Sequence, residues 1–296
     1  MMDLVQAIGN GLLLGAVYAL LGLCIVLIYK ASGVFNFAIG QFLIIGAYLF
    51  YFFYSGLSLP VYVSLPLGIL AAAAMGSLIE RLTINPLLGR DPIFMTKATL
   101  GLYFFLGALL QIGLVYLGSP GWAPLNLPDI SLQSDDLVFL SENIWAAVFA
   151  GLTFLAVALF FFFSHWGLAI RAVSEDQAKA LAYGIDSRFI LMLAWALSAV
   201  SVAICGILIS NAGILSASIA SVGFRAIPVA LIGGFDSVLG ALIAGCLIGV
   251  FETIIAMYVE PLGLIGFKDV AVYILMLIVL FIRPSGLFGT VPIERV

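Results

Sequence analysis

Residues 5–29 read VQAIGNGLLLGAVYALLGLCIVLIY, an apolar run that holds no charged residue. A helix needs about 20 such residues to cross the hydrocarbon core of a bilayer. The run is too long for the apolar region of a cleavable signal peptide, and no lysine or arginine precedes it. We therefore predict that it is the first membrane-spanning helix.

Similar apolar runs fill most of the chain. Of its 296 residues, 64 % are hydrophobic and 9 % are charged, and the mean hydropathy is +1.27, whereas soluble domains are about 45–50 % apolar and about 25 % charged. Uninterrupted runs favour helices over the alternating strands of a barrel. We expect an all-α polytopic membrane protein, a single transmembrane domain over residues 1–296 with about 8–9 spans, some of them discontinuous. The further runs lie at 37–54, 59–79, 98–118, 143–164, 189–210, 226–233 with 238–258, and 269–282.

The charges between these runs orient the chain in the membrane. The basic residues concentrate in the 80–97 and 165–188 loops, while the 119–142 loop is acidic and holds no lysine or arginine. Because basic loops stay in the cytoplasm, we predict the first two loops inside and the third outside. A cytoplasmic C-terminus then requires the Gly- and Pro-interrupted region 211–235 to cross as a discontinuous helix. The basic residues are otherwise scattered, so nucleic-acid binding is not expected.

The 167–185 segment, GLAIRAVSEDQAKALAYGI, is unusually charged for this chain. Its apolar positions recur near helical spacing, so we predict a short amphipathic helix that ends at Gly184. Arg171 with Glu175, and Glu175 with Lys179, have the i,i+4 spacing of helix ion pairs. Such a helix could lie among lipid headgroups, but those helices favour cationic faces. The mixed charges here favour a protein partner at the cytoplasmic surface.

Two segments carry Gly, Asn, Gln or Pro at membrane depth. The first, 31–41, includes Asn36, Phe37, Gly40 and Gln41, and the second, 216–237, includes Gly233 and Gly234. Irregular backbone at this depth is tolerated where it is buried in protein or lines a watery cavity, and a pair of interrupted segments often marks a substrate path. The alternative is that both are ordinary interhelical turns. Small residues spaced by four, such as Gly11–Gly15–Ala19 and Gly245–Gly249, predict close helix packing.

Catalysis by this chain is not expected. The single histidine, His165, fits an interfacial position, and no nucleophile elbow, metal-ligand spacing or nucleotide motif occurs in the sequence. Glu252 is the clearest acid inside a span; it could bind a proton or a polar solute, or cap a helix near water. An ion-coupled secondary transporter using Glu252 is therefore the alternative to a partner-driven one, and a membrane scaffold is a third possibility. Glu80 is interpreted as a solvated or paired charge at a span end.

Four motifs together resemble the branched-chain amino-acid ABC importer permease family, of the smaller, LivH-type subunit. Residues 167–185 resemble its ATPase-coupling loop, 33–40 (GVFNFAIG) and 230–241 (ALIGGFDSVLGA) two of its internal segments, and 283–289 (RPSGLFG) its terminal motif. They follow the family's order over nearly the whole chain.

The resemblance implies a type II-like ABC importer permease in a bacterial inner membrane. Its implied partners are a second, larger permease subunit, two cytoplasmic ATPase subunits that hold ATP-Mg, and a periplasmic substrate-binding protein, within membrane lipid; no cofactor would be bound by this chain. The implied substrates are branched-chain or related amino acids, amides, urea or small organic acids. Carried over by motif, the coupling residues are Arg171, Glu175, Asp176, Lys179, Gly184 and Ile185, and the path residues are Asn36, Phe37, Gly40, Gln41, Gly233 and Gly234, to which we add Glu252.

Overall fold

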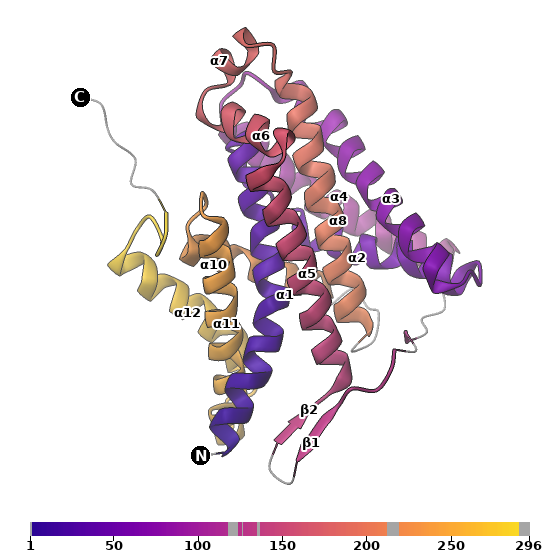
Figure 1. Cartoon of the computed structure of the whole chain (residues 1–296), viewed down its shortest axis with the longest axis vertical. Helices are drawn as coiled ribbons and strands as arrows, with labels where there is room; N and C mark the ends of the chain where they lie inside the picture. Colours follow the sequence, from indigo (N-terminus) through magenta and orange to yellow (C-terminus); the bar gives the residue numbers. More distant parts are fainter. Residues whose placement is uncertain (1, 118–123, 126, 135–136, 212–218, 290–296) are drawn as a thin grey trace. The chain divides into compact units, whose positions relative to one another are not determined.

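The protein is described from a computed structural model that covers residues 2–117, 124–125, 127–134, 137–211 and 219–289. These residues are almost entirely helical (Figure 1), which confirms the all-α class. The longer helices are α1 (Met2–Ser32), α2 (Ile39–Tyr51), α3 (Val61–Ile79), α4 (Pro92–Leu117), α5 (Ser141–Phe163), α8 (Ser187–Asn211), α11 (Val238–Tyr258) and α12 (Phe267–Ile282). The shorter elements are α6 (His165–Glu175), α7 (Gln177–Ala182), α9 (Ile219–Val222), α10 (Ala226–Gly233), the π-helical turns Phe52–Gly56 and Glu80–Ile84, and the 3-10 turns Asn85–Leu87, Gly223–Arg225 and Glu260–Leu262.

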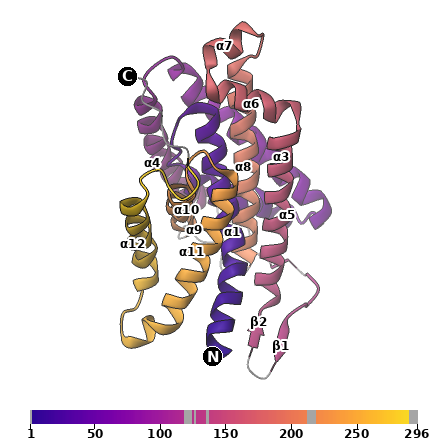
Figure 2. The same ribbon diagram turned by 60° about the vertical axis from the view of Figure 1, so that its left-hand side comes forward.

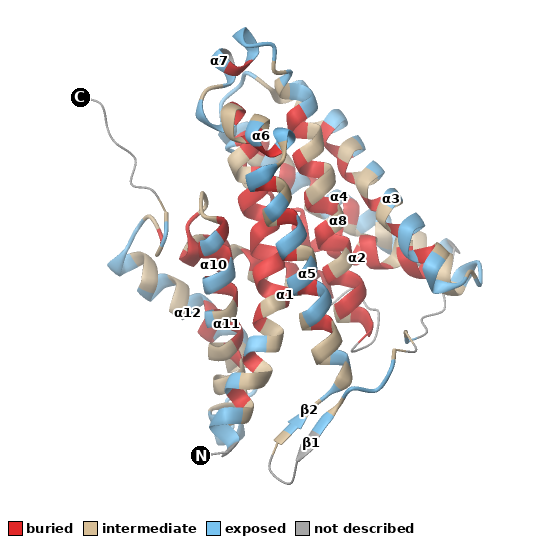
Figure 3. Cartoon of the chain, viewed as in Figure 1, coloured by how far each residue is buried: buried red, intermediate tan, exposed pale blue. Residues whose placement is uncertain are grey.

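Seven of the described helices are long and apolar enough to cross a membrane. They coincide with the predicted apolar runs, because an isolated chain in lipid satisfies its backbone only by forming helices. The predicted discontinuous region forms the short helices α9 and α10 around a 3-10 turn, within the apolar stretch Ile219–Gly233. Many large apolar side chains are exposed on the outer helices, as expected for lipid-facing surface (Figure 3).

The chain divides into two compact units, one of residues 1–26, 128–154 and 225–296, and the other of residues 27–127 and 155–224. The first holds the start of α1, the hairpin of β1 (Leu132–Ser134) and β2 (Leu137–Phe139), the first part of α5, and α10 to α12. The second holds the end of α1, α2 to α4, the end of α5, and α6 to α9. Helices α1 and α5 therefore each contribute to both units.

In the second unit, α2 is the buried centre and packs on both α3 and α8. Glycines permit these helices to approach closely. A methyl group built on Gly76 would lie 2.6 Å from the Cβ of Ala199, and one on Gly68 would lie 3.1 Å from the Cα of Phe50. The buried Trp195 of α8 makes an edge contact with Phe42 of α2.

In the first unit, the N-terminal part of α1 lies beside α11 (Figure 2). The two helices pack through small residues. A methyl group built on Gly11 would lie 2.5 Å from the Cα of Val250, and one on Gly15 would lie 2.7 Å from the Cα of Cys246. Gly245 and Gly249 in turn face Ala19 and Gly15. The predicted packing role of both small-residue motifs is confirmed, and the two motifs pack against each other.

Candidate coupling segment and translocation path

The charged segment is two helices rather than the single helix that the sequence predicted. α6 begins at the cap residue Ser164, whose hydroxyl accepts a hydrogen bond of 2.9 Å from the amide of Gly167. It ends at Asp176, which has extended backbone angles (φ −162°, ψ 105°), and α7 then starts at Gln177. The Asp176 carboxylate accepts a hydrogen bond of 3.0 Å from the amide of Lys179 in the first turn of α7. The prediction was wrong because an Asp side chain can cap a new helix as well as sit within one.

The two predicted i,i+4 ion pairs are not formed in the described segment. Arg171 is held instead at the end of α5: its guanidinium donates a hydrogen bond of 2.5 Å to the carbonyl of Phe161 and lies over the ring of the same residue. Lys179 pairs with Asp176 at 3.1 Å, while Glu175 is exposed. Backbone carbonyls at the end of α5 hold Arg171, and Asp176 at the interhelix break holds Lys179, in place of the predicted partners.

One face of the segment is buried, and its end is a defined turn. Ile170 and Val173 of α6 are buried in the second unit. At the end of α7, the amides of Gly184 and Ile185 donate to the carbonyls of Leu181 (2.9 Å) and Ala180 (3.0 Å), which is the Schellman pattern. Gly184 has φ +81°, a value that glycine adopts without strain. Gly184 as the helix terminator is confirmed.

An open hollow of about 520 Å³ lies beside this turn. His165 and Trp166 at the start of α6 line one side, and Gly184, Ile185 and Phe189 line the other. Outside the hollow, Leu181 of α7 is 64 % exposed and Tyr183, just after α7, is 87 % exposed. The segment is therefore anchored on one face, and its other face is exposed beside the turn and the hollow.

The residues from Asn36 to Gln41 form the buried junction between α1 and α2. The side-chain oxygen of Asn36 accepts a hydrogen bond of 2.9 Å from the amide of Ala38, and the amide of Phe37 donates to the Thr99 hydroxyl at 3.2 Å. Gln41 is buried and lies next to Gly107 of α4. These side-chain acceptors take the place of the helical carbonyls that the interrupted backbone lacks.

The junction meets the second interrupted segment within the same unit. A methyl group on Gly40 would overlap the carbonyl oxygen of Ala220 in α9, and one on Gly223 would overlap the backbone of Gly40. The structure thus brings together residues 36–41 and 219–224, which the sequence paired only by composition. Residues 216–218 of that segment lie outside the described residues, and the role of the two segments as a path stays a prediction.

Gly233 and Gly234 lie in the first unit, at the break between α10 and α11. Gly234 ends α10 with φ +97°. The terminal motif folds back on this break: the amide of Leu287 donates to the carbonyl of Ile232 at 2.7 Å, and that of Phe288 to Gly233 at 3.2 Å. The break therefore has its backbone groups satisfied by the chain's own C-terminal turn.

Glu252 belongs to a charge cluster that the sequence did not predict. It is 5 % exposed in the interior of α11, so a water-facing cap is excluded. Arg225 Nε lies 3.2 Å from one carboxylate oxygen and 3.3 Å from the other, and Nη2 is 3.2 Å from the latter. Arg225 also pairs with Asp269 of α12, and Tyr18 is buried beside Glu252. The position of Arg225 in an apolar region could have indicated this cluster, because a cation in such a region needs a charged partner.

Glu80 differs from its predicted state. Its side chain is fully buried rather than solvated, and neither carboxylate oxygen has a hydrogen-bond partner among the described residues. It stands in a π-helical turn that continues α3. Single-turn π segments occur frequently at functional sites.

Within the described part of the chain, seven helices long and apolar enough to span a membrane, together with buried charges and helix breaks, define a multi-pass helical membrane protein. Its similarity to membrane permeases makes it a protein of the inner membrane. Residues 7–281 match the family described as branched-chain amino acid transport system / permease component. The chain therefore belongs to this family of ABC importer permeases. An ion-coupled secondary transporter using Glu252 is not supported by this membership, nor by the pairing of Glu252 with Arg225.

Named relatives cover nearly the same length. The chain is 28 % identical to the high-affinity branched-chain amino acid transport system permease protein LivH of Salmonella typhimurium, over 98 % of this chain and 97 % of the relative. The same values hold for LivH of Escherichia coli. It is 29 % identical to the corresponding permease protein BraD of Pseudomonas aeruginosa, with the same coverage. No solved structure gives a significant match to the chain.

Proposed function

We propose that this chain is the non-catalytic permease subunit that carries branched-chain amino acids across the inner membrane. Its proposed partners are a second, larger permease subunit, two cytoplasmic ATPase subunits that bind ATP with magnesium, and a periplasmic substrate-binding protein. The chain itself would bind no cofactor. The observation that carries this proposal is similarity over nearly the full length to permeases named for branched-chain amino acid transport. The charged segment, with one anchored and one exposed face, supports the proposed ATPase contact.

In this proposal the ATPase subunits bind the segment that contains Arg171, Glu175, Asp176, Lys179, Gly184 and Ile185. Arg171 would tie α6 to the end of α5, so that a displacement of α6 pulls on that span. The exposed Glu175 and Lys179 would contact the partner. Helix α8 begins two residues after Ile185, so the turn at Gly184 joins the contact surface to a second span.

The proposed path runs along the interrupted segments. The Gly40–Gly223 contact in the second unit leaves no room for a side chain, so a small shift of the turn after α9 against α2 would separate the two segments. In the first unit the break at Gly233 and Gly234 and the buried Glu252 contribute further path residues. Gly233 is tightly packed against Gly240, so this break too can change shape only by helix movement.

The coupling proposal is tested with Gly184→Ala in the complete importer reconstituted in liposomes. A Cβ at φ +81° costs about 1–2 kcal/mol, because left-handed backbone brings it close to the carbonyl. Gly184→Asn is the rescue, since asparagine tolerates this conformation. Gly263→Ala is the matched control, because Gly263 has φ +97° and, like Gly184, no atom near a built Cβ, and lies in the turn that the topology predicts outside.

We expect Gly184→Ala to lower leucine uptake while ATP hydrolysis continues, Gly184→Asn to restore uptake, and Gly263→Ala to leave both unchanged. Equal losses in Gly184→Ala and Gly263→Ala would refute a specific coupling role. Uptake that persists without ATP, or that collapses with a protonophore while ATP is kept high, would refute the ATP-driven mechanism.

A further inference from the structure

Glu80 presents an unusual buried carboxylate in the second unit. Its exposure is 0 %, and no described group donates a hydrogen bond to either of its oxygens. A buried acid without a partner carries a large desolvation cost, so it calls for an explanation, and a ligand that completes it is one. The π-helical turn Glu80–Ile84 sets the direction of this side chain at the end of α3.

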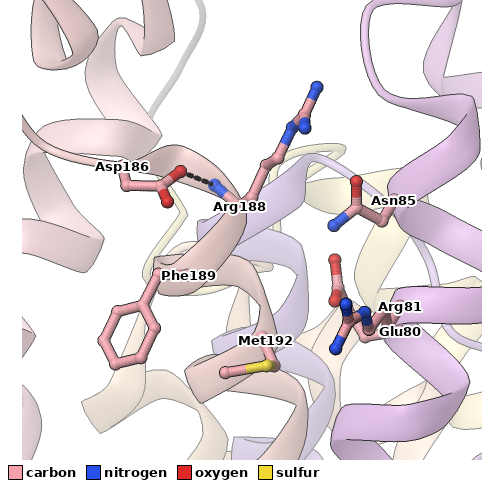
Figure 4. Close-up of a pocket in the computed structure, with 7 residues that line it drawn as sticks. All are labelled: Glu80, Arg81, Asn85, Asp186, Arg188, Phe189 and Met192. Carbon is pink, nitrogen blue, oxygen red and sulfur yellow. Dashed lines mark hydrogen bonds between the residues drawn. The ribbon is translucent and has the colours of Figure 1, made fainter.

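Glu80 lines a cavity of about 440 Å³, which is within the range of small-molecule sites. Arg81 and Asn85 stand on the same wall, and the start of α8 forms the opposite wall (Figure 4). There, Asp186 accepts a hydrogen bond of 3.0 Å from the amide of Arg188, which caps α8. The Arg188 guanidinium points away from Glu80, so it does not neutralise the acid in this structure.

The cavity therefore combines three kinds of group. Glu80 offers two carboxylate oxygens to which no described group donates a hydrogen bond, and these suit an ammonium group. Arg81 and Arg188 are exposed cations beside the N-terminus of a long helix, which suits a carboxylate. Met192 supplies apolar surface to the lining, whereas the Phe189 ring points away from Glu80 (Figure 4).

From this arrangement we infer that the cavity binds a free α-amino acid with an apolar side chain. The ammonium group lies at Glu80, the carboxylate lies at Arg81 and Arg188, and the side chain lies against Met192. The choice of an apolar amino acid rests on the proposed function, while the zwitterionic head follows from the charges alone. Because Asp186 directly follows Ile185, the bound amino acid contacts the chain next to the coupling turn.

An ethanolamine phospholipid headgroup carries the same pair of charges. The free amino acid is favoured because Met192 supplies apolar surface within the cavity lining itself. A lipid would instead place its acyl chains outside the headgroup site.

The test is equilibrium binding of radiolabelled leucine to the assembled importer, without its periplasmic binding protein, in nanodiscs of phosphatidylcholine. Competitors are 4-methylpentanoate, which lacks the ammonium group, and 3-methylbutylamine, which lacks the carboxylate. We expect Glu80→Gln to weaken leucine binding about 10- to 100-fold, the value of one charge-assisted hydrogen bond. Arg188→Gln should weaken it similarly.

Selectivity separates recognition from structural damage. In Glu80→Gln, 4-methylpentanoate should compete as well as leucine does, whereas misfolding would weaken all competitors alike. Control substitution Glu142→Gln, at an exposed position outside the cavity and outside the coupling segment, should leave binding unchanged. Leucine binding that is unaffected by Glu80→Gln and Arg188→Gln, or displacement of leucine only by phosphatidylethanolamine, would overturn the inference. If the wild-type importer takes up leucine but this site does not bind it, the inference fails and the proposed function stands; absent uptake would refute the proposed function instead.

Discussion

Breaking the Arg225–Glu252 pair should destabilise the first unit more than any surface change. The side chains of Arg225 and Glu252 are 12 % and 7 % exposed, and three nitrogen–oxygen contacts of 3.2–3.3 Å join them. Arg225→Met leaves the Glu252 carboxylate buried without its cation, which costs about 3–5 kcal/mol. Asp269 adds little to this figure, because its side chain is 55 % exposed and exposed pairs contribute about 0–1 kcal/mol.

The pair is best measured as a double-mutant cycle. Glu252→Leu alone should also destabilise, because it leaves Arg225 with only the half-exposed Asp269. Arg225→Met combined with Glu252→Leu removes both charges, and the cost should fall to about 1–2 kcal/mol or less. The coupling energy between the two positions should therefore exceed about 2 kcal/mol. Arg225→Lys should lie between wild type and Arg225→Met, since lysine cannot make the two-pronged contact.

The assay is reversible unfolding of the purified protein in mixed micelles, followed by tryptophan fluorescence, with far-ultraviolet circular dichroism to check helix content. A cost below about 1 kcal/mol for Arg225→Met, or a double variant as unstable as the sum of the single ones, would show that the buried pair does not carry this energy. Asp269→Asn serves as the control and should change stability by less than about 1 kcal/mol.

Three further changes test the packing of the two units. Gly15→Ala should destabilise the protein by about 1–3 kcal/mol in the same unfolding assay, because its methyl group meets the Cys246 backbone. The control Gly151→Ala, in open space within α5, should stabilise it by up to about 1 kcal/mol. Equal effects of the two substitutions would contradict the α1–α11 packing. Gly40→Ala should reduce leucine uptake without loss of membrane insertion, and normal uptake would argue against a tight junction with α9. Ser164→Ala should cost about 1 kcal/mol and speed hydrogen exchange in the first turn of α6, while unchanged exchange would show that the cap is dispensable.

The membrane spans were predictable because each is a local property of composition. Apolar runs specify helices in lipid, and Gly233–Gly234 marked the break before α11 without any tertiary information. Gly184 was predictable for the same reason, since its turn needs a residue that accepts positive φ.

Other features depend on contacts between distant residues. Arg225 and Glu252 are on different helices, so no periodicity relates them. The break at Asp176 was missed because the apolar spacing of α6 continues through α7, and only the capping contact with Lys179 decides the matter. The lack of a hydrogen-bond partner for Glu80 among the described residues likewise depends on which groups pack near it. Arg81 is adjacent in the sequence, but adjacency does not tell whether the two side chains pair.

The interlocking glycines of α1 and α11 bear on how the protein is made. Gly15 and Gly245 are about 230 residues apart, and ribosomes add roughly 5–20 residues per second. The N-terminal helix is therefore in the bilayer for roughly 10–50 seconds before the surface that it packs against has been synthesised. Exposing its small-residue face to lipid during this time costs little free energy, because the face is apolar and carries no charge. A ribosome that stalls before residue 238 leaves this helix without its partner, and that exposed face is the feature by which quality-control proteases in the membrane could recognise the unfinished chain.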